Sequence, residues 1–114
     1  MIIGIPVTGN MPSGPGEAQE VVLFDTSTGL EIDRYENPAL MATSGRGIAM
    51  IRSLLERRVE AMVVSGIGQH AFEVARRTLK VLNGEGLTLE QIVQEARKGA
   101  LHEITEPNHG MHSH

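Results

Sequence analysis

Cysteine is absent from this sequence of 114 residues, and aromatic side chains make up only 3% of it. Without cysteine the chain has no disulfides, no thiolate nucleophile and no thiolate ligands for zinc or an iron–sulfur cluster. Phe24, Tyr35 and Phe72 are too few for a surface on which bases stack, and a formal net charge of -4 does not suit a phosphate backbone. The composition therefore argues against a nucleic-acid partner.

Long hydrophobic runs are also missing. The longest apolar runs, such as residues 61–64, are far too short to cross a bilayer. Met1 leads directly into a strand-like run with no basic segment before it, so we expect no signal peptide. Apolar residues still reach 40%, enough for the core of one domain. The sequence predicts a cytoplasmic protein without a membrane partner.

Aspartate is scarce, with only Asp25 and Asp33 in the chain. A two-metal nuclease needs several carboxylates on its central strands, and neither 2–7 nor 61–65 contains one. Ser65 precedes a Gly-x-Gly turn but lacks the Gly-x-Ser-x-Gly elbow of a hydrolase. We therefore expect no catalytic residues and no enzyme.

Hydrophobic periodicity predicts alternating strands and helices. The expected strands are residues 2–7, 21–26, 30–36, 61–65 and 79–82, and the stretch 8–16 between the first two is expected to be irregular. Apolar stripes that begin at Ile48, Ala71 and Leu89 predict three helices, the last opened by a capping box at Thr88 and Gln91. The domain is expected to span 1–104, followed by a flexible tail over 105–114.

The order of these elements predicts the fold. A hairpin meander followed by two right-handed crossovers gives one mixed sheet covered by helices. With the strands numbered along the chain, the expected order is 3-2-1-4-5, with only strand 2 antiparallel. The prediction is a three-layer α/β domain with a five-stranded mixed sheet and three helices, in the ribonuclease-H-like arrangement.

Gly-x-Gly pairs follow four of the expected strands. They are Gly14/Gly16, Gly45/Gly47, Gly66/Gly68 and Gly84/Gly86. In the predicted topology these loops share one edge of the sheet, beside the switch point where open α/β sheets bind ligands. Free backbone N–H groups at the starts of helices favour an anion, although each pair alone is also compatible with a simple tight turn. The expected binding residues are Gly9, Asn10, Gly14, Gly16, Ser44, Gly45, Arg46, Gly47, Ser65, Gly66, Ile67, Gly68, Gln69, His70 and Gly84.

The third glycine pair permits a second interpretation. Residues 66–71 (GIGQHA) match the G-x-G-x-x-A dinucleotide fingerprint after a strand and before a helix. Only one strand follows the motif, so the chain lacks the βαβαβ half that holds a dinucleotide. The alternative function is a small-molecule phosphate or nucleotide-binding domain that uses the loop from Gly66 to Gly68.

Histidines provide the candidate metal ligands. His70 is expected in the first turn of the second helix, beside the switch point, either as a ligand or as a solvated polar residue. His109, His112 and His114 in the tail have a spacing that suits copper, nickel or zinc, or they belong to a merely polar terminus.

Several motifs, in order along the chain, resemble one known family. They are residues 3–7 (IGIPV), 36–38 (ENP), 45–47 (GRG), 63–72 (VVSGIGQHAF) and 84–91 (GEGLTLEQ). Together they resemble the dinitrogenase iron–molybdenum cofactor biosynthesis family, which includes NifX-like proteins and the C-terminal domain of NifB-like proteins. The resemblance covers residues 1 to about 104, nearly the whole domain.

The resemblance implies a non-enzymatic carrier in cofactor biosynthesis, with a ribonuclease-H-like fold. Its cargo would be the iron–molybdenum cofactor, or another anionic metal–sulfur cluster or precursor. Its partners would be cluster donor and acceptor proteins, with the chain itself a monomer or weak homo-oligomer. It implies related cluster binding rather than nitrogen fixation as such.

One loop departs from the family pattern. Relatives usually carry a motif like His-Phe-Gly-Arg-Ala between the first two strands, where this chain has Gly14-Pro15-Gly16-Glu17-Ala18. The imidazole, the aromatic ring and the base are replaced, and an acid stands where the base would be. His70 is then the one imidazole that we expect in the crevice.

Overall fold

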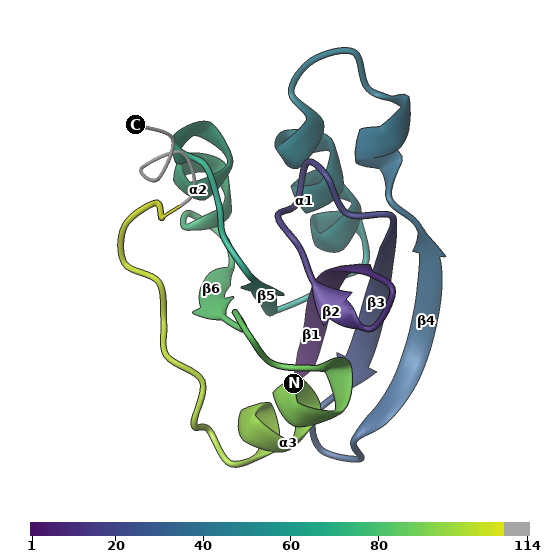
Figure 1. The fold of residues 1–114 in the computed structure, drawn as a ribbon, viewed down its shortest axis with the longest axis vertical. Coiled ribbons are helices and arrows are strands. Elements are labelled where there is room, and N and C mark those ends of the chain that lie inside the picture. Colours follow the sequence, from purple (N-terminus) through teal and green to yellow (C-terminus); the bar gives the residue numbers. More distant parts are fainter. Residues whose placement is uncertain (109–114) are drawn as a thin grey trace.

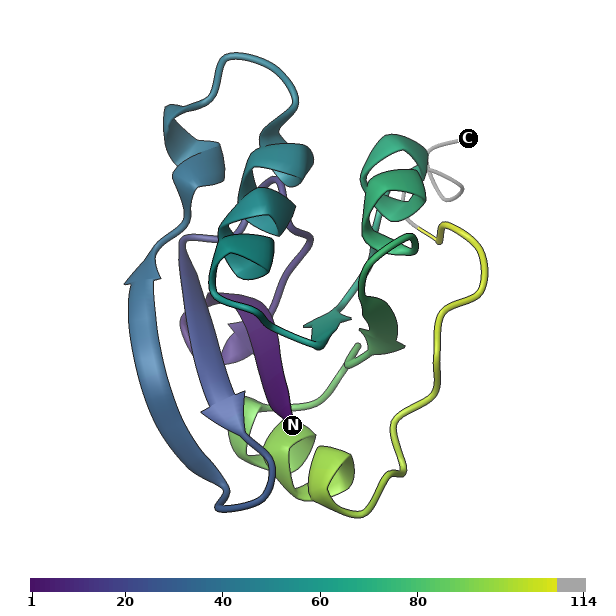
Figure 2. The ribbon, with the colours of Figure 1, turned by 180° about the vertical axis from the view of Figure 1, so that it is seen from behind.

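The structure, a computed structural model, describes residues 1–108. Its elements in chain order are β1 (Ile2–Thr8), β2 (Met11–Pro12), β3 (Glu20–Asp25), β4 (Leu30–Glu36), the 3-10 helix η1 (Pro38–Met41), α1 (Arg46–Glu56), β5 (Ala61–Val64), α2 (Gln69–Ala75), β6 (Lys80–Asn83) and α3 (Leu89–Arg97). Both Figure 1 and Figure 2 show one sheet with helices on either side of it.

The long strands lie in the order β4-β3-β1-β5-β6. β3 is antiparallel to both β1 and β4, whereas β5 is parallel to β1 and to β6. The predicted strand order and the single reversed strand are confirmed. The connectivity is compatible with a ribonuclease-H-like arrangement.

Two local predictions are wrong. The stretch 8–16 is not wholly irregular, because a turn at Gly9 (φ +66) lets Met11 and Pro12 pair with the end of β1 as β2. The helix predicted from the apolar stripe that begins at Ala71 is also shorter than the stripe, which includes Leu79, because α2 ends at Ala75. The carbonyl of Ala75 accepts bonds from the amides of Thr78 and Leu79, at 3.0 and 2.8 Å, and this turn leads the chain into β6.

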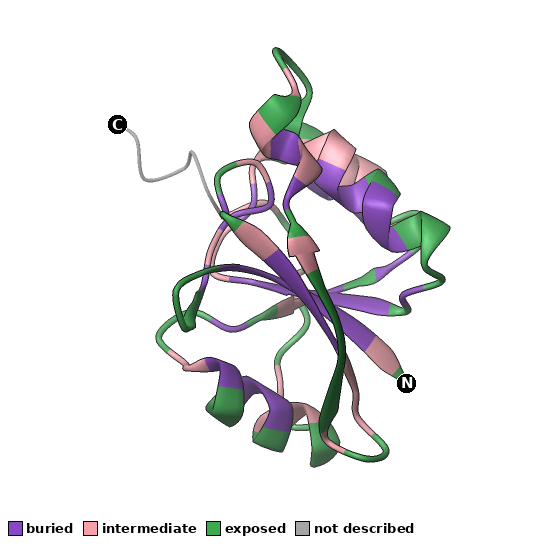
Figure 3. Ribbon diagram, turned by 90° about the vertical axis from the view of Figure 1, so that its right-hand side faces the viewer, coloured by how far each residue is buried: buried purple, intermediate pink, exposed green. Residues whose placement is uncertain are grey.

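The core is split into two halves by the sheet. Alternate side chains of a strand point to opposite faces, so each strand contributes to both halves. The half beneath α1 and α2 contains Val21, Leu23, Met50, Leu54, Met62, Val64 and Phe72, and the half above α3 contains Ile3, Ile5, Val22, Val63, Leu89 and Ile92. Figure 3 shows the buried sheet between these layers, so the fold has three layers.

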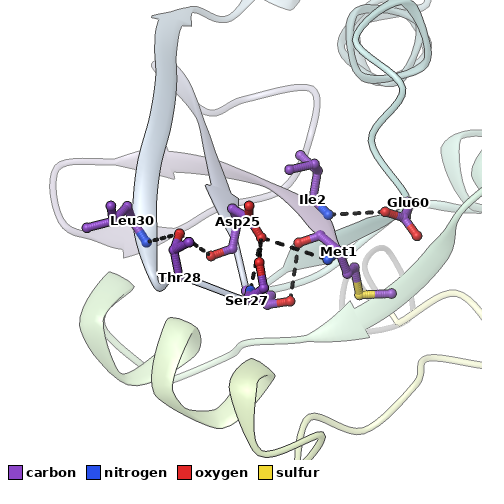
Figure 4. A network of polar contacts seen from close by, with 8 residues as sticks. Met1, Ile2, Asp25, Ser27, Thr28, Leu30 and Glu60 are labelled. Carbon is purple, nitrogen blue, oxygen red and sulfur yellow. Dashed lines mark hydrogen bonds and ion pairs between the residues drawn. The ribbon is translucent and has the colours of Figure 1, made fainter.

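A polar network closes the end of the sheet where β1 begins (Figure 4). The Asp25 carboxylate accepts bonds from the Ser27 amide at 2.9 Å and the Ser27 hydroxyl at 2.6 Å, and lies 3.9 Å from the amino group of Met1. The Ser27 hydroxyl is the main cause that lowers the pKa of Asp25 below its ordinary value. This end of the sheet satisfies its polar groups with its own side chains.

The chain continues after α3 along the free edge of β6. We call residues 100–108 the C-terminal strap; it rises past β6 towards α2 in Figure 1. His102 O accepts a bond from Asn83 N at 2.9 Å, and Ile104 N donates to Val81 O at 2.7 Å. Within the described residues, no helix combines the length and hydrophobicity needed to cross a membrane.

Candidate functional site

Three of the glycine loops meet where α1 and α2 begin. A Cβ added at Gly16 would lie 3.2 Å from Gly47 N, and one added at Gly47 would lie 3.0 Å from Ala71 Cβ. Ser65 N donates to Ser13 O at 3.4 Å, and this bond joins the loop before α2 to the loop after β2. Glycine lets these backbones approach more closely than other residues would allow.

The three loops surround a cavity of about 520 Å³. Its walls come from the loop after β2, the start of α1 and the start of α2, which lie at one end of the sheet (Figure 1). The lining residues are Gly14, Pro15, Gly16, Glu17, Gly45, Arg46, Gly47, Ile48, Gly68, Gln69, His70 and Ala71. We call this space the glycine cavity.

Two helix starts without side-chain caps contribute to the cavity wall. The N-cap residues of α1 and α2 are Gly45 and Gly68, and neither helix start has a side-chain cap. The first N–H groups of a helix have no partner within the helix, and they carry partial positive charge. The first residues of both helices line the cavity. This arrangement favours an anion, with the larger contribution from α1, since α2 has only 7 residues.

Four polar side chains complete the walls: Glu17, Arg46, Gln69 and His70. The Arg46 Nε donates to Ala39 O at 3.1 Å, which holds this guanidinium beside the cavity. His70 is exposed in the first turn of α2, as predicted. The wall thus carries one basic and one acidic side chain, Arg46 and Glu17, beside the starts of the two helices.

Asn37 fixes the wall opposite α1, a role that the sequence did not reveal. Its side chain is fully buried and donates to Pro15 O at 2.9 Å and to Ala18 O at 3.0 Å. Its Oδ1 accepts from Ala39 N at 3.0 Å. In the sequence, Asn37 stood out only as part of the family motif at residues 36–38, and only the fold shows that its amide holds the glycine loop.

The structure brings together eight of the predicted binding residues: Gly14, Gly16, Gly45, Arg46, Gly47, Gly68, Gln69 and His70. Ser44, Ser65, Gly66 and Ile67 belong to the same loops but not to the cavity lining.

Gly9, Asn10 and Gly84 lie elsewhere. Asn10 O accepts from Leu89 N at 3.1 Å, at the start of α3. A Cβ on Gly84 would lie 2.7 Å from Val63 and 3.0 Å from Ile92, so this glycine serves the contact between the sheet and α3. Two glycine pairs and Gly68 of a third therefore meet at the cavity, and the fourth pair does not, because the loop after β6 turns to the other face of the sheet.

No metal-ligand cluster accompanies the cavity. Among residues 1–108, no three His, Asp or Glu side chains gather in a way that would hold a metal ion. His70 is the only imidazole on the cavity wall within this range. The tail residues His109, His112 and His114 lie outside the described residues, so their metal binding stays a prediction.

The fold and the cavity define a small three-layer α/β domain with a glycine-lined pocket where α1 and α2 begin. A family model described as "Dinitrogenase iron-molybdenum cofactor" matches residues 1–99, and the chain belongs to this family. A search of curated proteins found no match.

Solved structures share the fold over nearly their whole lengths. The apo form of the orange protein from Desulfovibrio gigas is 24% identical, with a TM-score of 0.82 over 94% of this chain and 95% of that one. A candidate NifB protein from Thermotoga is 27% identical, with a TM-score of 0.76 over 96% and 97%. A candidate dinitrogenase from Methanocaldococcus jannaschii is 13% identical, with a TM-score of 0.72 over 94% and 97%.

Proposed function

We propose that this protein is a non-enzymatic carrier for an anionic metal–sulfur cluster of the iron–molybdenum type, or for a precursor of one. It takes the cluster from a donor protein and gives it to an acceptor in cofactor assembly, in the cytoplasm, as a monomer or weak homo-oligomer. The observation that carries the proposal is the glycine cavity, in a chain that belongs to the iron–molybdenum cofactor family.

The wall chemistry suits an anionic cargo held without a full set of ligands. Cluster sulfides accept hydrogen bonds from amides, and the starts of α1 and α2 provide amides without side-chain caps. Arg46 adds a fixed positive charge, and His70 offers one nitrogen ligand.

The same cavity walls would hold the cluster only weakly. Thiolate ligands are absent because the chain has no cysteine, and the cavity wall offers a single imidazole, that of His70, within the described residues. Binding through hydrogen bonds and one imidazole is readily reversible, as a carrier requires and a storage site does not.

The test is anaerobic reconstitution with iron, sulfide and molybdate, followed by visible absorption and acid-labile sulfide analysis. We expect charge-transfer absorption that weakens in His70→Ala and in Arg46→Gln. His102→Ala is the matched control, because His102 is exposed on the C-terminal strap and is not part of the cavity lining. Equal loss in His70→Ala and His102→Ala would contradict the assigned site.

Phosphate or nucleotide binding is the competing outcome. Gly68 lines the cavity, so the fingerprint that begins at Gly66 does reach this space. Absence of colour after reconstitution, together with clean nucleotide binding by calorimetry, would replace the carrier proposal with the nucleotide-binding alternative.

A further inference from the structure

The C-terminal strap lies outside the family match and ends beside the loop that precedes α2. The match ends at residue 99, and the strap begins directly after it. Leu101 packs against the core half that α3 covers, and Ile104 packs against the half beneath α1 and α2. The strap therefore crosses the free edge of β6 from one face of the sheet to the other.

At its end, the strap is bonded to the loop that precedes α2. Asn108 Oδ1 accepts from Ile67 N at 2.9 Å, and Asn108 N donates to Ile67 O at 3.2 Å. The single residue Asn108 thus satisfies both backbone groups of Ile67. Ile67 itself is fully buried, and buried backbone groups are costly to leave without partners.

The two bonds between Asn108 and Ile67 lie one residue before Gly68, where the cavity wall begins. Gly68 follows Ile67 directly, caps α2 without a side chain, and lines the cavity with Gln69 and His70. Gly68 has no atoms within 4 Å of an added Cβ, so no neighbour confines it on that side. The bonds from Asn108 therefore fix the backbone directly before this wall.

We propose that Asn108 is a positioning residue of the glycine cavity. By pairing with Ile67 it holds Gly68 and the first turn of α2 in place, and it thereby sets the affinity of the cavity for its anionic ligand. The inference rests on the proposed function for the ligand, but its structural half can be tested without one.

Amide hydrogen exchange, measured by NMR on the full chain, tests whether Asn108 holds Gly68 and the first turn of α2 in place. In Asn108→Ala we expect exchange about tenfold or more faster at Ile67, and faster at Phe72, whose amide donates to Gly68 O at 2.9 Å, with little change at Ala49, whose amide donates to Gly45 O in α1. Asn108→Asp keeps an acceptor oxygen and should restore slow exchange at Ile67. Thr105→Ala, at an exposed strap position, is the control and should resemble the parent chain. Unchanged exchange in Asn108→Ala would overturn the proposal.

A titration with tetrathiomolybdate, a simple molybdenum–sulfur anion, tests the other half. We expect at least severalfold weaker binding by Asn108→Ala than by Thr105→Ala, with similar thermal stability. Equal binding by the two variants would overturn the link between the strap and the ligand. A parent chain that binds no anion would instead contradict the proposed function and the affinity role, and leave the exchange result as a separate finding.

Discussion

The three α-helices within residues 1–108 begin in two different ways. At α3, the Thr88 hydroxyl accepts from Gln91 N at 3.2 Å and the Gln91 side chain accepts from Thr88 N at 2.9 Å, which completes a capping box. At α1 and α2 the caps are Gly45 and Gly68, with no side-chain bond. The capped helix covers one face of the sheet, and the two uncapped starts face the glycine cavity.

This difference indicates which helix starts keep backbone amides that can bind an external anion. A side-chain cap consumes amides that otherwise bind an external anion. α3 uses its amides for its own stability, whereas α1 and α2 keep theirs at the cavity. The same contrast exists between the ends of the sheet, since the end at Asp25 is closed by its own side chains (Figure 4).

The largest effect is expected where a buried side chain supports the uncapped wall. Asn37→Ala leaves the carbonyls of Pro15 and Ala18 and the amide of Ala39 without their partner. We expect the free energy of unfolding to fall by about 2–4 kcal/mol, because several buried polar groups lose their bonds together. Urea denaturation measures this loss.

The matched control for this change is Asn83→Ala. Asn83 is exposed, and its side chain accepts one bond, from Glu85 N at 3.0 Å. The free energy of unfolding should fall much less in Asn83→Ala than in Asn37→Ala. Similar losses in the two variants would mean that burial of Asn37 does not support the loop.

Removing the cap of α3 is expected to have an intermediate effect. Thr88→Ala removes the acceptor for Gln91 N, and such changes lower the free energy of unfolding by about 1 kcal/mol. Anion binding at the glycine cavity should not change, because α3 is not part of its lining. Weaker anion binding in Thr88→Ala, measured at a temperature where the chain is fully folded, would break the contrast between the helices.

The sequence predicted the sheet order and the capping box at Thr88, and it predicted that four glycine pairs share one edge of the sheet, of which residues from three line the cavity. These features follow from local patterns: periodicity places the strands, and glycine marks the turns. The placement of Gly84 was not predictable from its own motif. Its loop resembles the others in sequence, and only its contacts with Val63 and Ile92 direct it to the α3 face.

Long-range polar contacts were the other feature beyond the reach of sequence patterns. Asn37 bonds Pro15 across 22 positions, and Asn108 bonds Ile67 across 41. Asparagine is common in loops for local reasons, so nothing in the residue type distinguishes these two from Asn83. Their roles appear only once the fold brings the loops together.

Adding a cap to α2 should have a smaller effect on stability and the opposite sign. Gly68 has extended backbone angles (φ -76, ψ 167) and open space around it, so Gly68→Ser fits without strain. We expect a gain of a few tenths of a kcal/mol, roughly the usual advantage of serine over glycine at an N-cap. Anion binding should weaken, because the new hydroxyl competes for the α2 amides. Calorimetric titration with tetrathiomolybdate measures this, and unchanged affinity would show that these amides do not contact the ligand.

The smallest effect is expected at the closed end of the sheet, and it depends on pH. Because the Ser27 hydroxyl lowers the pKa of Asp25 in the folded chain, the folded protein prefers the ionised carboxylate more than the unfolded chain does. The contribution to stability is therefore fully present above the ordinary pKa of 3.8 and is lost as the pH falls through the lowered value. Asp25→Asn should lower the melting temperature slightly at pH 6, and the difference from the parent chain should shrink towards pH 3. Glu106→Gln removes the same charge at an exposed strap position and is the control. A difference for Asp25→Asn that stays constant over this range would mean that its carboxylate is not stabilised by Ser27, and that the closed end of the sheet is held by backbone pairing alone.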